Sequence, residues 1–446
     1  MKNIKIYNLL SIIMLLFIGC EAEDEFLTPD FTGEVILNKI SDYDLLLNSN
    51  DLDGILRIAN EPGTLMSDNI SLTDSDVSRL SDTELNIYSW AESIYTIDEN
   101  PSIWTEHYNA IFSYNSIINN IENASDINVR GNDFLAKKYK AEALLGRAFE
   151  HLWLVNIFAQ PYSETSKSSP GIPYMINDDS SLPTPSRETI EDTYAKIEQD
   201  LTEALIDLPD SPDISTRGSK AAVYGVLARM YLYKQDYDNV IINAQKALNI
   251  KNDVLDFTTF PTLPDLAKHE NIENVYVRVI AGRTAFFKPL SSDLSALFNP
   301  LDLRRNLYAF FGRFGFQHVY PMIGISVPEI MLSKAEAHAR KNELTNALDI
   351  LNELSQKRLF VALPLSSTNQ EEVLNWVLEE RRRETMVSGL RFSDMRRLQL
   401  EGRIGVVTHD LENGDLVNLE EGSNRYTLAI PKVVIDKNPE MQQNPR

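Results

Sequence analysis

Cysteine and histidine are scarce in this sequence of 446 residues, which contains one cysteine, Cys20, and six histidines. A lone cysteine excludes an intramolecular disulfide and a zinc site made of several thiolates. The histidines form no HExxH motif and no pair at ligand spacing on one helix. The sequence also lacks a G-x-S-x-G motif, a P-loop and a G-x-G-x-x-G motif after a strand. These absences give no indication of zinc-protease, serine-hydrolase or nucleotide chemistry, and we expect no metal and no cofactor.

Positive charge is scarce as well. The chain has 42 lysine and arginine residues against 65 aspartate and glutamate residues, which gives a net charge of −23 and a pI near 4.7. Such a surface repels phosphates, so we expect no nucleic-acid partner and no binding of anionic lipid headgroups through the protein surface. Solubility is the simplest interpretation of the acidity. The content of 43% hydrophobic and 24% charged residues is that of a folded soluble body.

The N-terminus has the features of a secretory signal. Lys2 and Lys5 precede the apolar run Leu9–Ile18, which is too short to span a bilayer. A small residue and then Cys20 end this run, and the arrangement resembles a bacterial lipobox, which is cut before the cysteine and acylated on it. The position three residues before the cysteine holds Phe17, where the usual pattern has leucine. The alternative is an ordinary signal peptide with an incidental cysteine.

The residues behind Cys20 are acidic. The run Glu21–Glu25 resembles the surface-export signal of Bacteroidetes lipoproteins, and its alternative interpretation is a solvated tether. We therefore expect residues 1–19 to be a lipoprotein signal peptide, residues 20–32 an acylated tether, and residues 33–446 the folded domain.

The clearest structural signal is a helical hairpin over Ala221–Lys251. Apolar residues recur at helical spacing on both sides of a break at Gln235–Tyr237, with small residues where two helices must approach closely. Residues 334–354 repeat the pattern at the same offsets, so that Ala335, Ala347 and Leu354 match Ala228, Val240 and Ala247. This arrangement resembles a tetratricopeptide repeat. One such unit cannot bury its own apolar face, so we expect other helices to flank it.

The predicted fold is mainly α. Tetratricopeptide-like repeats over about 102–250 and 327–387 form a scaffold, and irregular insertions over about 61–100 and 252–324 form a loop-rich ligand-binding subdomain. Periodicity and turn residues predict one helix that begins with Pro101 at its first helical position, and a short helix within 38–48. Further helices are predicted over 134–158, 190–208, 327–341, 344–358 and 369–387, and the helix over 190–208 is predicted to have its cap at 184–188. A strand is predicted over 273–280.

Separated motifs resemble segments of one family. Leu378–Glu384 (LEERRRE) followed by Gly389–Arg397 (GLRFSDMRR) resembles the "ER..E…G.R..DLRR" segment of SusD/RagB-type outer-membrane proteins. Ala141–Ala148 resembles their "AEA…RA" helix, and Val327–Ala337 resembles their "EI.L..AEA" helix. Residues 428–445 resemble their closing "PIP…NP…QNPGY", without the final glycine and aromatic residue. The resemblance covers essentially the whole chain.

The resemblance implies a helical protein with tetratricopeptide-like repeats that is lipid-anchored through Cys20 at the cell-surface side of the outer membrane. Such proteins cap a SusC-type TonB-dependent transporter and capture nutrient oligomers, mostly glycans and sometimes peptides. They have no catalytic activity.

Two stretches, Met66–Tyr95 and Arg278–Phe316, combine aromatic with amide, carboxylate or guanidinium groups. Sugar recognition needs aromatic side chains for the C–H face of the ring and polar or charged side chains for its hydroxyls. Trp90 is the leading candidate because it lies outside the clear helices, whereas the other three tryptophans, at 104, 153 and 376, lie on apolar helical faces. Core packing is the alternative for every aromatic residue. The predicted ligand-binding residues are Trp90, Tyr88, Asp68, Asn69, Arg283, Phe286, Tyr308, Phe310 and Arg313.

The charged cluster Glu380–Glu384 has two interpretations, an anion or substrate site and an ion-pair network that fixes the C-terminal helix to the repeats. The network is favoured because Glu380 and Arg383, or Glu384 and Arg381, lie three residues apart on a helix and can pair.

Three functions are compatible with the sequence. The leading one is capture of oligosaccharides for delivery to a SusC-like TonB-dependent outer-membrane transporter, with peptides as the alternative ligand. A tetratricopeptide scaffold for protein interactions is the second. A glycoside hydrolase that uses a carboxylate pair such as Asp68 and Asp74 is the third.

Overall fold

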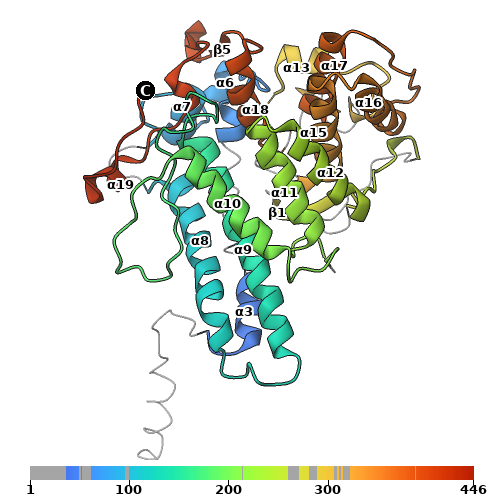
Figure 1. Ribbon diagram of the computed structural model, residues 1–446. Coiled ribbons are helices and arrows are strands. Elements are labelled where there is room, and N and C mark those ends of the chain that lie inside the picture. Colours follow the sequence, from blue (N-terminus) through green and yellow to red (C-terminus); the bar gives the residue numbers. More distant parts are fainter. Residues whose placement is uncertain are drawn as a thin grey trace, which may run out of the picture.

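The computed structural model describes residues 37–49, 52, 62–95, 100–212, 214–259, 271–280, 289–305, 309–310, 313–314, 322–386 and 388–446. Helices account for most of these residues and the strands are few and short, so the predicted mainly α fold is confirmed (Figure 1). The signal peptide and acylated tether predicted for residues 1–32 lie outside the described residues.

Long helices pack in pairs, most of which are neighbours along the chain. Helix α8 pairs with α9, α9 with α10, α11 with α12, α12 with α15, and α15 with both α16 and α17. Figure 1 shows these pairs side by side. Their bounds are α8 Ser102–Asn120, α9 Asn132–Phe158, α10 Ile190–Ala204, α11 Lys220–Tyr233, α12 Tyr237–Ile250, α15 Val327–Arg340, α16 Leu344–Arg358 and α17 Gln370–Glu384.

Short elements surround this scaffold. The short α-helices are α3 Ile40–Leu47, α6 Asp74–Val77, α7 Asp82–Tyr88, α13 Ser292–Ala296, α18 Arg391–Leu398 and α19 Lys432–Lys437. Among the described residues, antiparallel pairing joins β1 Asn274–Ile280 to β4 Met322–Ser326, β2 Ala309–Phe310 to β3 Arg313–Phe314, and β5 Val407–Asp410 to β6 Leu416–Leu419. The strand predicted over 273–280 is therefore confirmed.

The helical hairpin predicted over Ala221–Lys251 is present as α11 and α12, and its second copy is present as α15 and α16. The two turns contain equivalent residues with positive φ, Gln235 at 59° and Asn342 at 60°.

The close contact between α8 and α9 depends on a glycine: a Cβ on Gly146 of α9 would lie 2.3 Å from the ring of Tyr114 on α8. Only a residue without a side chain lets α8 and α9 pack at this distance.

Several predicted boundaries were wrong. Pro101 is the N-cap of α8 rather than its first helical residue. Helix α10 is capped by Thr189, whose hydroxyl accepts a hydrogen bond from the Asp192 amide at 3.0 Å, and not by residues 184–188. It ends at Ala204 because the chain turns at 205–207. The stretch 61–100 is not wholly irregular, since α6 and α7 lie within it and both begin with a capping box.

The charged cluster on α17 forms a buried ion-pair network, as the favoured interpretation predicted. Glu380 pairs with Arg383 at 2.7 Å. The other predicted pair was wrong, because Arg381 bonds Asp394 of α18 at 2.9 Å and Glu384 instead joins two arginines outside the helix, Arg304 and Arg358, each at 2.6 Å. Since a buried charge is costly unless it is paired, these contacts fix α17 and α18 against the repeats.

Candidate functional site

The predicted aromatic residues Trp90 and Tyr88 lie in the core. Each has an exposed fraction of 0%, and their rings stack on the two sides of His409, with ring centroids 4.1 and 4.2 Å away. The indole N–H of Trp90 donates to the Met66 carbonyl at 3.1 Å. Neither ring offers a free face to a ligand in this structure, so their role in binding stays a prediction, and the structure gives it no support.

Asp68 and Asn69 bind arginine side chains of the C-terminal helices α17 and α18. The Asp68 carboxylate accepts two hydrogen bonds from Arg391, both at 2.6 Å, and the Asn69 side-chain oxygen accepts one from Arg382 at 2.9 Å. Burial raises the pKa of Asp68, but the guanidinium groups of Arg391 and Arg382 outweigh it and lower the pKa below its ordinary value.

The second group of predicted residues cannot be placed in the same way. Arg283, Phe286 and Tyr308 lie outside the described residues. Phe310 and Arg313 pair across the β2–β3 hairpin through their backbones. Their roles stay predictions.

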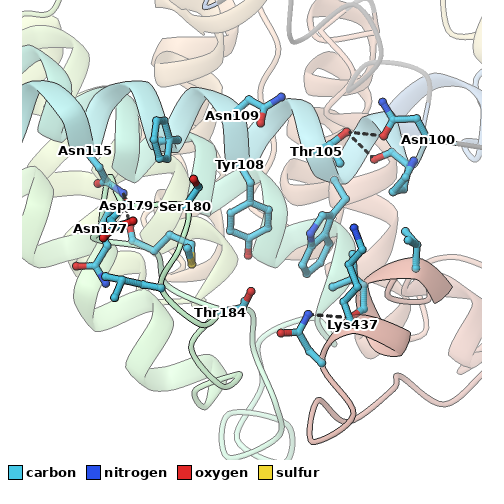
Figure 2. Close-up of a pocket in the computed structure, with 18 residues that line it drawn as sticks. Asn100, Thr105, Tyr108, Asn109, Asn115, Asn177, Asp179, Ser180, Thr184 and Lys437 are labelled. Atoms are coloured by element: carbon cyan, nitrogen blue, oxygen red, sulfur yellow. Dashed lines mark hydrogen bonds between the residues drawn. The ribbon is translucent and has the colours of Figure 1, made fainter. Parts of the chain in front are cut away.

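A cavity of about 600 Å³ lies elsewhere, between α8, the loop over residues 175–184 and α19 (Figure 2). This volume is typical of small-molecule sites. The residues that line it are Asn100, Pro101, Trp104, Thr105, Tyr108, Asn109, Phe112, Asn115, Met175, Asn177, Asp179, Ser180, Leu182, Thr184, Val433, Val434, Lys437 and Asn438.

One wall of the cavity is aromatic. Trp104, Tyr108 and Phe112 follow one another at intervals of one helical turn on α8, so their side chains share a face. Trp104 is buried and packs edge-on against Phe158, with ring centroids 5.0 Å apart. Phe112 is the most open of the three, with an exposed fraction of 41%. The wall thus presents flat apolar surface at the mouth of the cavity.

The opposite wall is a loop that side chains from the helices hold in place. The Tyr108 hydroxyl donates to the Pro173 carbonyl at 2.8 Å. The Asn115 amide donates to the Met175 and Asn177 carbonyls at 3.1 and 3.0 Å. Because these bonds reach three positions along residues 173–177, they fix that wall relative to α8.

A buried polar cluster supports Asn115 from below. Arg147 donates to the Asn115 side-chain oxygen at 2.9 Å and forms a bidentate pair with Asp200, with both distances 2.7 Å. The imidazole of His151 bonds the Arg147 carbonyl through Nδ1 and accepts from the Met175 amide through Nε2 at 3.1 Å. Burial lowers the pKa of His151 to about 3, so the ring is neutral at physiological pH and suits this pair of bonds.

Polar side chains complete the cavity. Asn109 and Asn177 bring amides, Asp179 a carboxylate and Lys437 an ammonium group. Figure 2 shows Asn177, Asp179 and Lys437 on the side of α8 to which the Tyr108 ring points. Hydrogen bonds from the hydroxyl and amide of Ser181 lower the pKa of Asp179 below its ordinary value. No cluster of three or more histidine, cysteine or acidic side chains suitable for a metal ion occurs among the described residues. The cavity therefore offers stacking and hydrogen bonding.

Sequence reasoning missed this cavity. It assigned Trp104 correctly to an apolar helical face but treated the helix as scaffold only. Phe112 could have indicated the cavity, because it is an aromatic residue of the same helix that does not belong to the residues facing the core. The contribution of α19, which is more than 250 residues away in the chain, left no local signal.

Comparison with known protein families matches two parts of the chain. Residues 39–232 match a SusD-like family described as "Starch-binding associating with outer membrane", and residues 327–446 match the SusD family. No curated protein matches the chain.

Solved structures share the fold over nearly the whole length. A candidate sugar-binding protein from Bacteroides vulgatus aligns with a TM-score of 0.74 at 22% identity, covering 92% of this chain and 99% of its own. A SusD superfamily protein from Bacteroides thetaiotaomicron aligns with a TM-score of 0.73 at 22% identity, covering 92% and 100%. A SusD-like carbohydrate-binding protein from Bacteroides vulgatus gives 0.69 at 17% identity, covering 91% and 97%.

Proposed function

Because the chain belongs to the SusD/RagB family of non-catalytic binding proteins, we propose that it captures oligosaccharides at the outer-membrane surface and delivers them to a SusC-like TonB-dependent transporter. In this proposal Cys20 carries the lipid that anchors the protein, and the transporter is the partner that receives the ligand.

The observation that carries the proposal is the cavity on α8. A sugar ring has C–H faces that stack on aromatic side chains and hydroxyls that bond amides and carboxylates. Tyr108 and Phe112 supply the first kind of surface, and Asn109, Asn177 and Asp179 supply the second. Two relatives with the same fold are described as binding sugar or carbohydrate, and one matched family as binding starch, which supports the choice of ligand class.

The membrane attachment in this proposal is a lipid. The family is associated with the outer membrane, and none of the helices among the described residues combines the length with the apolar sequence that a bilayer-spanning segment needs. Metabolic labelling with radioactive palmitate, in wild type and in a Cys20→Ser variant, tests the anchor. Label in the wild type and none in the variant is the expected result.

Phe112→Ala tests the cavity. Soluble polysaccharides are first screened by affinity electrophoresis, and oligomers of any that bind are then titrated calorimetrically. Losing the half-open Phe112 ring removes about 1 kcal/mol of apolar contact, so we expect roughly five- to tenfold weaker binding. Phe360→Ala is the matched control, since Phe360 is 71% exposed and does not line the cavity.

Two outcomes would count against the proposal. If the Phe112→Ala and Phe360→Ala proteins bind the identified glycan with equal affinity, the cavity is not the glycan-binding site. Binding of peptides, with no glycan bound in the screen, would replace oligosaccharides by the alternative ligand class.

A further inference from the structure

The joined ends of α8 and α9 form a projection with exposed apolar side chains. We call residues 126–138 the hairpin tip; they comprise the turn before α9 and the first seven residues of that helix. Figure 1 shows that this end of the helix pair, together with α3, projects away from the other helices. Val129 and Phe134 lie on the hairpin tip with exposed fractions of 58% and 64%. Single exposed apolar residues are ordinary, so their surroundings decide what they mean.

The charge of the hairpin tip differs from that of the whole chain. The chain carries a net charge of −23, yet Arg130 and Lys137 are exposed here, and Lys39 is exposed at the start of the neighbouring α3. Asp133 is an exposed acidic residue in the hairpin tip, whereas Asp126 is only partly exposed and accepts a hydrogen bond from the Ile40 amide at 2.9 Å. Glu122, just after α8, is exposed as well and pairs with Lys140 at 2.8 Å, so exposed basic charge exceeds exposed acidic charge here by one.

The chain also enters the described structure beside the hairpin tip. The Ser125 amide donates to the Asn38 carbonyl at 2.8 Å, which fastens the start of α3 to the turn before the tip. Residues 21–36 separate Cys20 from this point, and a chain of this length spans at most about 60 Å when fully extended. A lipid on Cys20 would thus hold this end of the molecule within reach of the membrane.

We propose that the hairpin tip rests on the outer membrane itself, with Val129 and Phe134 in the headgroup region and Arg130, Lys137 and Lys39 against lipid phosphates. Basic residues near an anionic lipid surface are attracted to it, and apolar side chains gain by entering the interface. This inference rests on the proposed function in one respect, namely that a lipid on Cys20 anchors the protein at the outer membrane. The expectation that an acidic protein avoids anionic headgroups holds for its average surface and not for this end.

Vesicle cosedimentation tests the proposal with the unlipidated Cys20→Ser chain. The probes are vesicles of phosphatidylethanolamine with phosphatidylglycerol, compared with pure phosphatidylcholine. We expect salt-sensitive binding to the anionic vesicles. Both Val129→Ser/Phe134→Ser and Arg130→Gln/Lys137→Gln should weaken it on the order of tenfold, because each basic residue near the surface contributes appreciably to the attraction.

Matched controls separate the hairpin tip from general effects. Phe360→Ser removes a similarly exposed ring elsewhere, and Lys167→Gln/Lys246→Gln removes the same charge elsewhere, so both should bind vesicles like the parent chain. Absence of vesicle binding, or equal loss in control and tip variants, overturns the proposal. Tip variants that still bind vesicles but lose association with an outer-membrane protein also overturn it and make the surface a protein contact.

The same variants keep this test distinct from the proposed function. Glycan titration of Val129→Ser/Phe134→Ser should give the parent affinity, because neither residue lines the cavity. A tip that binds vesicles in a protein without glycan affinity would refute the proposed function and leave the membrane contact standing.

Discussion

Replacing Asn115 by leucine tests how the loop wall of the cavity is held. In the wild type, Asn115 is fully buried, donates to the carbonyls of Met175 and Asn177, and accepts from Arg147. Leucine has the same number of side-chain heavy atoms and the same branching at Cγ but can make none of these three bonds. Each lost bond inside the protein costs about 1 kcal/mol, so the free energy of unfolding should fall by about 3 kcal/mol if the loop stays in place. If residues 173–177 move out to water instead, the stability loss is smaller and the cavity loses its wall.

Urea unfolding and glycan titration of the same protein distinguish these outcomes, because a loop that stays in place keeps the wild-type affinity for the glycan and a loop that moves out weakens it. Asn119→Leu is the control, because Asn119 lies one helical turn further along α8 and bonds the same loop, at the Ile176 carbonyl, from an exposed position. We expect Asn119→Leu to change stability by less than about 0.5 kcal/mol and to leave affinity unchanged. An Asn115→Leu protein with wild-type stability and affinity would refute the inference that this side chain holds the wall.

Two further predictions concern the scaffold. Burial disfavours the charged form of Glu336, but the guanidinium groups of Arg397 and Arg340 outweigh it and lower the pKa to about 2. The stability that the charged carboxylate contributes to the folded protein is therefore fully present above the ordinary carboxyl pKa and is lost as pH falls from about 4.5 to 2. Glu336→Gln should therefore be less stable than wild type by about 3 kcal/mol at pH 7, with the gap closing in that acidic range; a gap independent of pH in urea unfolding would contradict this. In the repeat turns, Gln235→Gly should raise the free energy of unfolding by about 0.5–1 kcal/mol because glycine tolerates positive φ. Asn342→Gly should gain less than half of that, since asparagine already tolerates this conformation, and an equal gain at both positions in thermal unfolding would argue against backbone strain as the cause.

The repeats were predictable because their determinants are local. Small residues such as Ala228 and Ala247 recur at helical spacing, and the same spacing places them at the contact between α11 and α12. Helix boundaries were less predictable because several signals compete near them. Thr184, Ser186 and Thr189 are all able to cap a helix, and the structure shows that Thr189 does so, through its hydrogen bond with the Asp192 amide.

The candidate site was mostly not predictable, for a physical reason. Trp90 was chosen because it lies outside a regular helix, yet it has a positive φ of 51° and both its ring and its N–H are occupied by distant residues, His409 and Met66. Aromatic residues in loops of a large protein are drawn into the core when a partner ring is available, and no local pattern reveals that partner. The cavity likewise depends on α8 meeting α19, a contact fixed by the whole fold.

Helix α8 connects the two proposed functional surfaces. Its buried face packs on α9, its open face carries Tyr108 and Phe112, and its end leads into the hairpin tip. At a rise of 1.5 Å per residue, the eight residues from Phe112 to Asn120 place the cavity only about 12 Å from the end of the helix. If the hairpin tip rests on lipid, an oligosaccharide bound against Phe112 is held within a few nanometres of the membrane surface. A ligand held there needs little further transfer to reach a transporter embedded in the same membrane, whereas a tip turned away from the membrane would place the cavity on the far side of the protein.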